Sequence, residues 1–168
     1  MSARISVRKQ LKQVNSLYIL KEIDRHCDSY SRMGTLLDAY PLLEREHFFK
    51  ALGWHWCFSD NICDFKDELT QILGNASREE LDLMMEPDEL ATLAKMPAII
   101  KIYRGCYEKN RDGLSWTTDK AVAELHTKKL RYSSLNKNEI PLLLEDSIDS
   151  GRAVLKLERE EWEIIKYW

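Results

Sequence analysis

Apolar residues recur at every third or fourth position through the first ninety residues, which is the spacing of amphipathic helices. The first stripe predicts one long helix over 5–26. Two further stripes predict helices over about 42–53 and 62–74, each ending at a glycine. Two shorter helical segments follow before Pro97, which cannot continue a helix. The N-terminal part of the chain is therefore predicted to be helical.

The pattern changes after Pro97, where β-branched and aromatic residues alternate with polar ones. The segment AIIKIYRG predicts a strand, LSW a short strand, and the residues after Thr118 a helix over about 119–130. IPLLLE and RAVLKLE predict two strands separated by a turn at DSIDSG. The final segment, EEWEIIKYW, alternates as a strand with Glu161 and Glu163 on one face and Trp162 on the other.

Helices followed by strands, without βαβ alternation, predict an α+β fold. We expect a helical subdomain over 1–96 and a strand-rich core over 97–168, which together make one compact unit of 168 residues.

Composition excludes two ways of binding nucleotides. The six glycines lie no closer than eight positions apart, so neither G-x-G-x-x-G nor a P-loop is present. The 25 basic and 28 acidic side chains give a net charge of −3. Neither half of the chain has the basic excess that nucleic-acid binding usually needs, so nucleic acid is not an expected partner.

The chain also lacks an apolar run long enough for a secretory signal or a membrane span, which predicts a cytoplasmic protein without a membrane partner. Its four cysteines are expected to be free thiols. His55, Cys57 and Cys63 resemble part of a zinc site, but there is no C-x-x-C pair and a fourth ligand is missing, so no metal is expected.

The carboxylates of Glu161 and Glu163 are the first candidate for chemistry. On a regular strand their Cα atoms lie about 6.5 Å apart on one face, where two negative charges repel unless a cation lies between them. A substrate guanidinium or a developing oxocarbenium ion would provide that cation. The alternative is a solvated edge strand whose charges oppose aggregation.

Three motifs in order carry a family resemblance: Tyr103-Arg104-Gly105, then Gly113-Leu114-Ser115-Trp116-Thr117, then Glu161-x-Glu163 followed by two aliphatic residues. This order resembles the arginine–serine–glutamate class of ADP-ribosyltransferases, and in particular small members encoded by phages and mobile elements. The resemblance spans about residues 54–168. It implies a split β-sandwich of the ADP-ribosyltransferase type with the helical N-terminal half packed on it.

The resemblance implies that NAD is bound as a substrate and that no metal takes part. Arg104 would hold the NAD diphosphate or the nicotinamide ribose, because a guanidinium offers charge-assisted donors to oxygen atoms. Gly105 would let the backbone approach the nicotinamide carboxamide. Tyr103 and Trp116 are further cofactor-binding candidates. Alternation along the strand places the Trp116 side chain on the other face from Ser115, so packing beneath the strand is its alternative role.

The same resemblance implies the catalytic roles. Glu163 would accept a hydrogen bond from the ribose 2′-hydroxyl and stabilise the cationic sugar as nicotinamide leaves. Glu161 would position and deprotonate the acceptor. Ser115 would hydrogen-bond the ribose and orient the catalytic carboxylate. Thr117, also in the cofactor-binding set, would hold the strand and the glutamate behind it. The E-x-E form implies arginine as the acceptor.

The expected function is therefore mono-ADP-ribosyl transfer from NAD to a side chain of a protein target, with a host protein as partner in the cytoplasm of a bacterium. Two alternatives stay open. One is a weakly active or inactive module of this fold that inhibits a host defence protein by binding it. The other is an NAD glycohydrolase toxin, which would destroy NAD without an acceptor.

Overall fold

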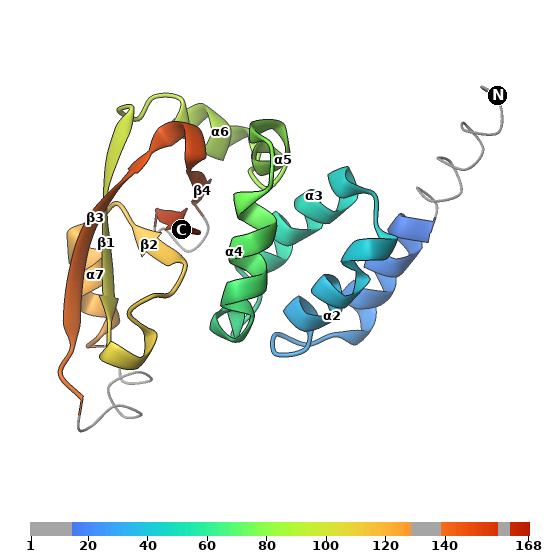
Figure 1. Ribbon diagram of the computed structural model, residues 1–168, viewed down its shortest axis with the longest axis horizontal. Helices are drawn as coiled ribbons and strands as arrows, with labels where there is room; N and C mark the ends of the chain where they lie inside the picture. The colour runs from blue at the N-terminus through green and yellow to red at the C-terminus, as the bar shows by residue number, and fades with distance from the viewer. Residues whose placement is uncertain (1–14, 129–138, 158–161) are drawn as a thin grey trace. The chain divides into compact units, whose positions relative to one another are not determined.

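The computed structural model describes residues 15–128, 139–157 and 162–168 (Figure 1). Helices predominate up to Leu93, and the strands follow in one antiparallel sheet, so the predicted α+β class with its helices mainly N-terminal is confirmed. The predicted helix over 5–26 is helical over 15–26, and its first ten residues lie outside the described ones. The helices that follow are α2 (Arg32–Ala39), α3 (Arg45–Trp56), α4 (Lys66–Gly74), α5 (Arg78–Asp82) and α6 (Pro87–Leu93). In the described part of the chain no helix has the length and apolar character needed to cross a membrane.

The strands are β1 (Ile99–Cys106), β2 (Ser115–Thr117), β3 (Leu142–Asp149), β4 (Val154–Lys156) and β5 (Glu163–Ile165), with α7 (Lys120–His126) between β2 and β3. Single 3-10 turns connect several elements: η1 (Tyr40–Leu42), η2 (Ile62–Phe65), η3 (Glu108–Asn110) and η4 (Ser150–Arg152).

The chain forms two compact units whose boundary differs from the predicted one at residue 96. Unit 1 contains the described residues up to Phe65 together with Glu79–Met84. Unit 2 contains Lys66–Arg78 and the described residues from Met85 onward. The helices α4 and α6 therefore belong with the sheet, and not with the helices that precede them.

Unit 1 is built around apolar faces of α2 and α3. Phe48, Phe49 and Leu52 are fully buried, and Tyr40 packs on Phe48 with ring centroids 4.4 Å apart. The prediction that Gly53 ends the helix is wrong, because α3 continues to Trp56. A β-carbon at position 53 would overlap the backbone of Met84, so this glycine permits a close approach inside the helix.

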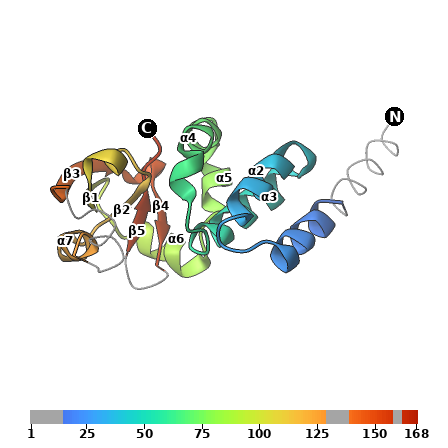
Figure 2. The same cartoon turned by 90° about the horizontal axis from the view of Figure 1, so that it is seen from below.

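Unit 2 is built on a five-stranded sheet in the order β3-β1-β2-β5-β4, with every neighbouring pair antiparallel. Strands β1 and β3 pair along eight residues, from Ile99 opposite Asp149 to Cys106 opposite Leu142. Helix α7 lies along β1 in both views (Figures 1 and 2).

Two predicted strand boundaries are corrected. The sequence DSID, predicted as a turn, continues β3 as far as Asp149, because Ile148 is buried opposite Ile100. Trp162, predicted inside the last strand, has a φ of 46° and precedes β5, which begins at Glu163. The predicted helix over 119–130 is described as far as residue 128, and α7 itself ends at His126.

Candidate functional site

The three motifs that resemble a known family lie on adjacent strands. Strand β1 carries Arg104, β2 begins at Ser115, and β5 begins at Glu163. In the order β3-β1-β2-β5-β4 these strands are direct neighbours, although nearly sixty residues separate the first motif from the last. The sheet therefore brings the predicted site residues into one region of unit 2.

A row of side chains crosses this region on one face of the sheet. Thr117 lies directly opposite Tyr103 on one side and opposite Glu163 on the other, and Glu163 in turn lies opposite Lys156. Directly paired residues share a face, with Cβ atoms about 4.5–5.5 Å apart. We call Tyr103, Thr117, Glu163 and Lys156 the polar row.

Ser115 lies on the face of the polar row, because it is two residues before Thr117 on β2. Both Ser115 and Glu163 are half-buried, whereas Thr117 is buried and its hydroxyl oxygen accepts a hydrogen bond from the Asp119 N–H at 3.0 Å. Asp119 caps α7 by accepting from the Ala121 N–H at 2.8 Å. The structure thus brings Ser115, Thr117 and Glu163 together, and Thr117 also fixes the start of α7.

Arg104 and Trp116 lie on the opposite face of the sheet. Each is the chain neighbour of a residue in the polar row, and successive side chains on a strand point to opposite faces. The Arg104 guanidinium donates to the Ser115 carbonyl oxygen and, at 3.0 Å, to the Asn110 carbonyl oxygen. It lies against Gly113, where a β-carbon would overlap it. Arg104 therefore holds together the turn between β1 and β2, and its contact with NAD stays a prediction.

Gly105 lies on the face of the polar row, where helix α7 packs. A β-carbon at this position would overlap the Ala123 carbonyl oxygen, so glycine is needed here for the close approach of α7 to β1. This requirement exists in the protein without any ligand. It gives the glycine of the first motif a structural role in addition to the cofactor-binding role implied by the resemblance.

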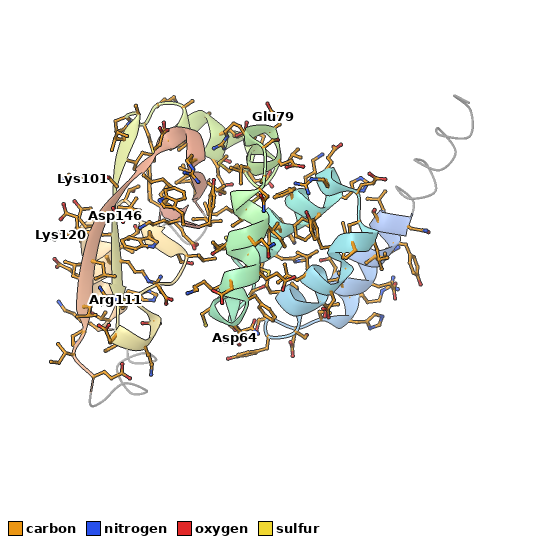
Figure 3. The ribbon with its side chains drawn as sticks, viewed as in Figure 1. Asp64, Glu79, Lys101, Arg111, Lys120 and Asp146 are labelled. Atoms are coloured by element: carbon orange, nitrogen blue, oxygen red, sulfur yellow. The ribbon has the colours of Figure 1, made fainter. Side chains whose placement is uncertain are left out.

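Trp116 is packed beneath the sheet, as its alternative role predicted. Its side chain is buried, and its indole N–H donates to the Gly113 carbonyl oxygen at 3.0 Å. The Lys166 ammonium lies 4.8 Å from the Trp116 ring centroid and also bonds to Asp146, which projects from β3 (Figure 3). The Lys166 ammonium holds the pKa of Asp146 below its usual value.

Cys106, which follows the first motif, is a buried thiol. Burial raises its pKa, and the nearby Arg104 opposes this effect only in part. A thiol with a raised pKa is protonated near neutral pH and is a poor nucleophile. Cys106 is therefore a core residue and not a candidate nucleophile.

The carboxylate pair of the third motif is described only in part. Glu163 belongs to β5, whereas Glu161 lies outside the described residues. The left-handed backbone of Trp162 interrupts the extended geometry on which the separation of about 6.5 Å between the two Cα atoms was based. The placement of Glu161 relative to Glu163 stays a prediction.

A buried ion pair beside Glu163 was missed by sequence reasoning. Lys156 on β4 is 2% exposed, and its ammonium lies 2.8 Å from a carboxylate oxygen of Glu89, whose side chain is 3% exposed. Only the position of Lys156 in RAVLKLE, between apolar neighbours on a predicted strand, could have suggested a buried cation. Glu89 looked like a residue of the first turn of a helix, which it also is.

His55, considered in the sequence as a partial metal ligand, is buried in unit 1. Its Nε2 lies 3.4 Å from Asp24, and its Nδ1 has no hydrogen-bond partner among the described residues. Burial lowers the pKa of His55, with Arg32 adding to this effect and Asp24 opposing it. The histidine therefore belongs to the contact between α3 and the helix over 15–26.

Comparison of the chain with protein-family models, with curated proteins and with solved structures found no match.

Proposed function

We propose that this protein is an enzyme, a mono-ADP-ribosyltransferase that transfers ADP-ribose from NAD to a side chain of a protein target, with arginine as the acceptor. The observation that carries the proposal is the register of β2 and β5, which sets Thr117 opposite Glu163 and Ser115 on the same face. The family resemblance assigns Ser115 and Glu163 to the NAD ribose, and Thr117 to the support of the strand between them. The finer fold assignment, an ADP-ribosyltransferase sheet, is part of the same proposal.

In the proposed reaction, the bond between C1′ of the ribose and the nicotinamide nitrogen breaks. Its electron pair leaves with nicotinamide, which becomes neutral, and positive charge develops on the ribose. The Glu163 carboxylate stabilises this oxocarbenium ion and accepts a hydrogen bond from the 2′-hydroxyl, while Ser115 orients the ribose. A guanidinium nitrogen of the acceptor then forms the new bond to C1′ and gives its proton to the Glu161 carboxylate.

NAD binding is tested by thermal unfolding of the purified protein with increasing NAD. A ligand that binds only the folded state stabilises it by about 2.7 kcal/mol at a concentration one hundred times its Kd. We expect the melting temperature to rise with NAD and the rise to shrink in Ser115→Ala. An unchanged melting temperature at millimolar NAD would contradict tight binding of NAD by the folded protein.

Transfer is tested with labelled NAD and a bacterial lysate. We expect labelled protein with the wild type and none with Glu163→Gln, which keeps the shape of the side chain but loses the charge. The matched control is Glu145→Gln on β3. Glu145 is the strand partner of Tyr103 in the same sheet, and its carboxylate lies 3.2 Å from the ammonium of exposed Lys101. Release of nicotinamide by the pure protein without any acceptor would indicate the NAD glycohydrolase alternative.

A second candidate is a binding module of this fold that inhibits a host defence protein by contact. The observation that favours it is Arg104, whose guanidinium donates to carbonyl oxygens of its own turn on the opposite face from Ser115. Unit 1 offers a surface for such contact, since Trp54 and Phe58 are 53% and 41% exposed and their rings pack 5.3 Å apart.

The two candidates differ in which variants lose the effect of the protein on its host target in cells. Contact inhibition predicts that Glu163→Gln keeps the cellular effect and that the double substitution Trp54→Ala and Phe58→Ala removes it. Leu42→Ala, which also removes an exposed apolar side chain, controls for the loss of surface area. Loss of the effect in Glu163→Gln alone would favour the transferase.

A further inference from the structure

Lys156 is a cation on an inner surface of unit 2. It occupies the end of β4, where Val154 and Leu155 are fully buried, and the lysine itself is 2% exposed. A buried ammonium is costly unless a carboxylate and further hydrogen bonds compensate for lost water. A lysine here needs a reason beyond packing, because an apolar side chain would fill the same volume at lower cost.

Glu89 provides the compensating charge from a fixed position. Its carboxylate accepts from the Lys156 ammonium at 2.8 Å, from the Leu157 N–H at 2.7 Å and from the Glu86 N–H at 2.8 Å. Two of these donors lie on or beside β4, and the third is at the start of α6. The carboxylate is thus bound on several sides, and it holds the lysine ammonium in one place.

Lys156 also lies directly opposite Glu163 in the pairing of β4 with β5. Their side chains share a face, and Glu163 lies between Lys156 and Thr117. Lys156 therefore has two acidic neighbours: Glu89 on α6, which its ammonium contacts, and Glu163 on β5, its partner across the strands. Together these three side chains carry one net negative charge, which suits a site that must stabilise a cationic sugar.

We propose that Lys156 is a positioning residue for Glu163, held in place by Glu89, so that α6 and β4 fix the carboxylate on the face that carries Ser115. This inference rests on the proposed transferase function for its effect on rate. The inferred interaction between Lys156 and Glu163 can be tested whether or not the protein turns over NAD.

The rate test compares Lys156→Met, which removes the charge but keeps the length, with Lys156→Arg, which keeps the charge. A displaced carboxylate lowers kcat by about tenfold or more, since small errors in geometry are costly. We expect this loss in Lys156→Met with an unchanged KM for NAD, and partial recovery in Lys156→Arg. Lys101→Met removes an exposed lysine of the same sheet, which is 72% exposed, and should leave kcat unchanged.

If Lys156→Met alone fails to fold, the double variant Lys156→Met with Glu89→Gln removes both charges and leaves no buried ion without its partner. We expect this variant to fold and to show the same loss in kcat. Wild-type kcat in a folded Lys156→Met or in this double variant would overturn the proposal.

A double-mutant cycle in urea distinguishes failure of this inference from failure of the proposed function. The unfolding midpoint is measured for Lys156→Met, Glu163→Gln and the two combined. We expect Glu163→Gln to shift the midpoint less in the Lys156→Met background than in the wild type. Equal shifts would overturn the positioning contact, whereas coupling in a protein that never consumes NAD would reject only the transferase.

Discussion

Single residues in this protein are constrained by how closely backbones approach one another. Gly105 is the clearest case, because the Ala123 carbonyl oxygen occupies the space where a β-carbon would stand. The same residue is the glycine that the family resemblance assigns to nicotinamide. The packing requirement and the proposed cofactor-binding role therefore fall on one position, and only a substitution can separate the two.

We expect Gly105→Ala to destabilise unit 2 by about 1–3 kcal/mol, because α7 must move away from β1 to admit the methyl group. Urea unfolding followed by circular dichroism measures this change. Gly74→Ala is the matched control, since nothing lies within 4 Å of a β-carbon there, and we expect it to stabilise the protein by about 0.5–1 kcal/mol. Wild-type stability of Gly105→Ala would contradict the close packing of α7 on β1.

Glycines also explain where helix prediction from the sequence failed. Helix α2 was not predicted, although Met33, Leu36 and Leu37 have helical spacing and are buried. A β-carbon at Gly34 within this helix would lie 2.9 Å from the Phe65 ring. A sequence does not show which ring or backbone will approach a glycine, so a packing glycine is mistaken for a terminating one.

At the scale of elements, α3 and the helix over 15–26 meet at His55. The imidazole is 2% exposed, whereas its partner Asp24 is 58% exposed. Protonation would place a positive charge on a buried imidazole near Arg32. The ion pair with exposed Asp24 compensates for this only weakly, because water screens it. The contact between these helices therefore favours neutral histidine.

This contact predicts that unit 1 loses stability in mild acid. Burial lowers the pKa of His55 below its usual value of 6.5 in the folded state, so the unfolded chain binds the proton first as pH falls. The contribution of neutral His55 to the free energy of unfolding is present above about pH 6.5. It decreases below that pH, by at most about 1.4 kcal/mol per pH unit.

Urea unfolding of the wild type and of His55→Gln at about pH 7.5 and about pH 5.5 measures this dependence. We expect the difference between the two pH values to be smaller in His55→Gln. His26→Gln, which removes a histidine whose side chain is 65% exposed, controls for the loss of a histidine as such. An equal pH dependence in wild type and His55→Gln would show that other groups cause it.

The candidate site shows what a sequence can and cannot predict at this scale. The β-branched residues of AIIKIYRG and the alternation in β2 were sufficient to place Arg104 and Trp116 on strands. Strand pairing was not predictable, because register depends on contacts between residues far apart in the chain. For that reason the separation of Arg104 from Ser115 onto two faces became visible only in the sheet.

The same limit hid the pairing of Lys156 with Glu163 and with Glu89. Each of these three residues lies in a different segment of the sequence, and nothing in the local pattern around Glu89 predicts a buried partner 67 residues away. Charged residues in a sequence are usually interpreted as part of a solvent-exposed face. A buried ion pair is an exception that only the assembled sheet and α6 reveal.

At the scale of the whole molecule, the two compact units do not follow the division at residue 96 that the change from helices to strands predicted. Unit 2 includes Lys66–Arg78 and the chain from Met85, so α4 and α6 belong to the unit that contains the sheet. Leu69 and Leu73 of α4 are buried, and α6 carries Glu89, the partner of buried Lys156. The change in sequence pattern marks where strands begin and not where a folding unit begins.

Fragments of the chain test this division. A fragment over 97–168 lacks Glu89, and removing one partner of a buried ion pair costs about 3–5 kcal/mol, which is a large part of the stability of a small domain. We therefore expect the fragment over 97–168 to be unfolded, and the fragment over 66–168 to unfold cooperatively in urea. Circular dichroism and the dispersion of amide signals in NMR distinguish the two outcomes. A folded fragment over 97–168 would place the boundary of the unit at the change in sequence pattern after all.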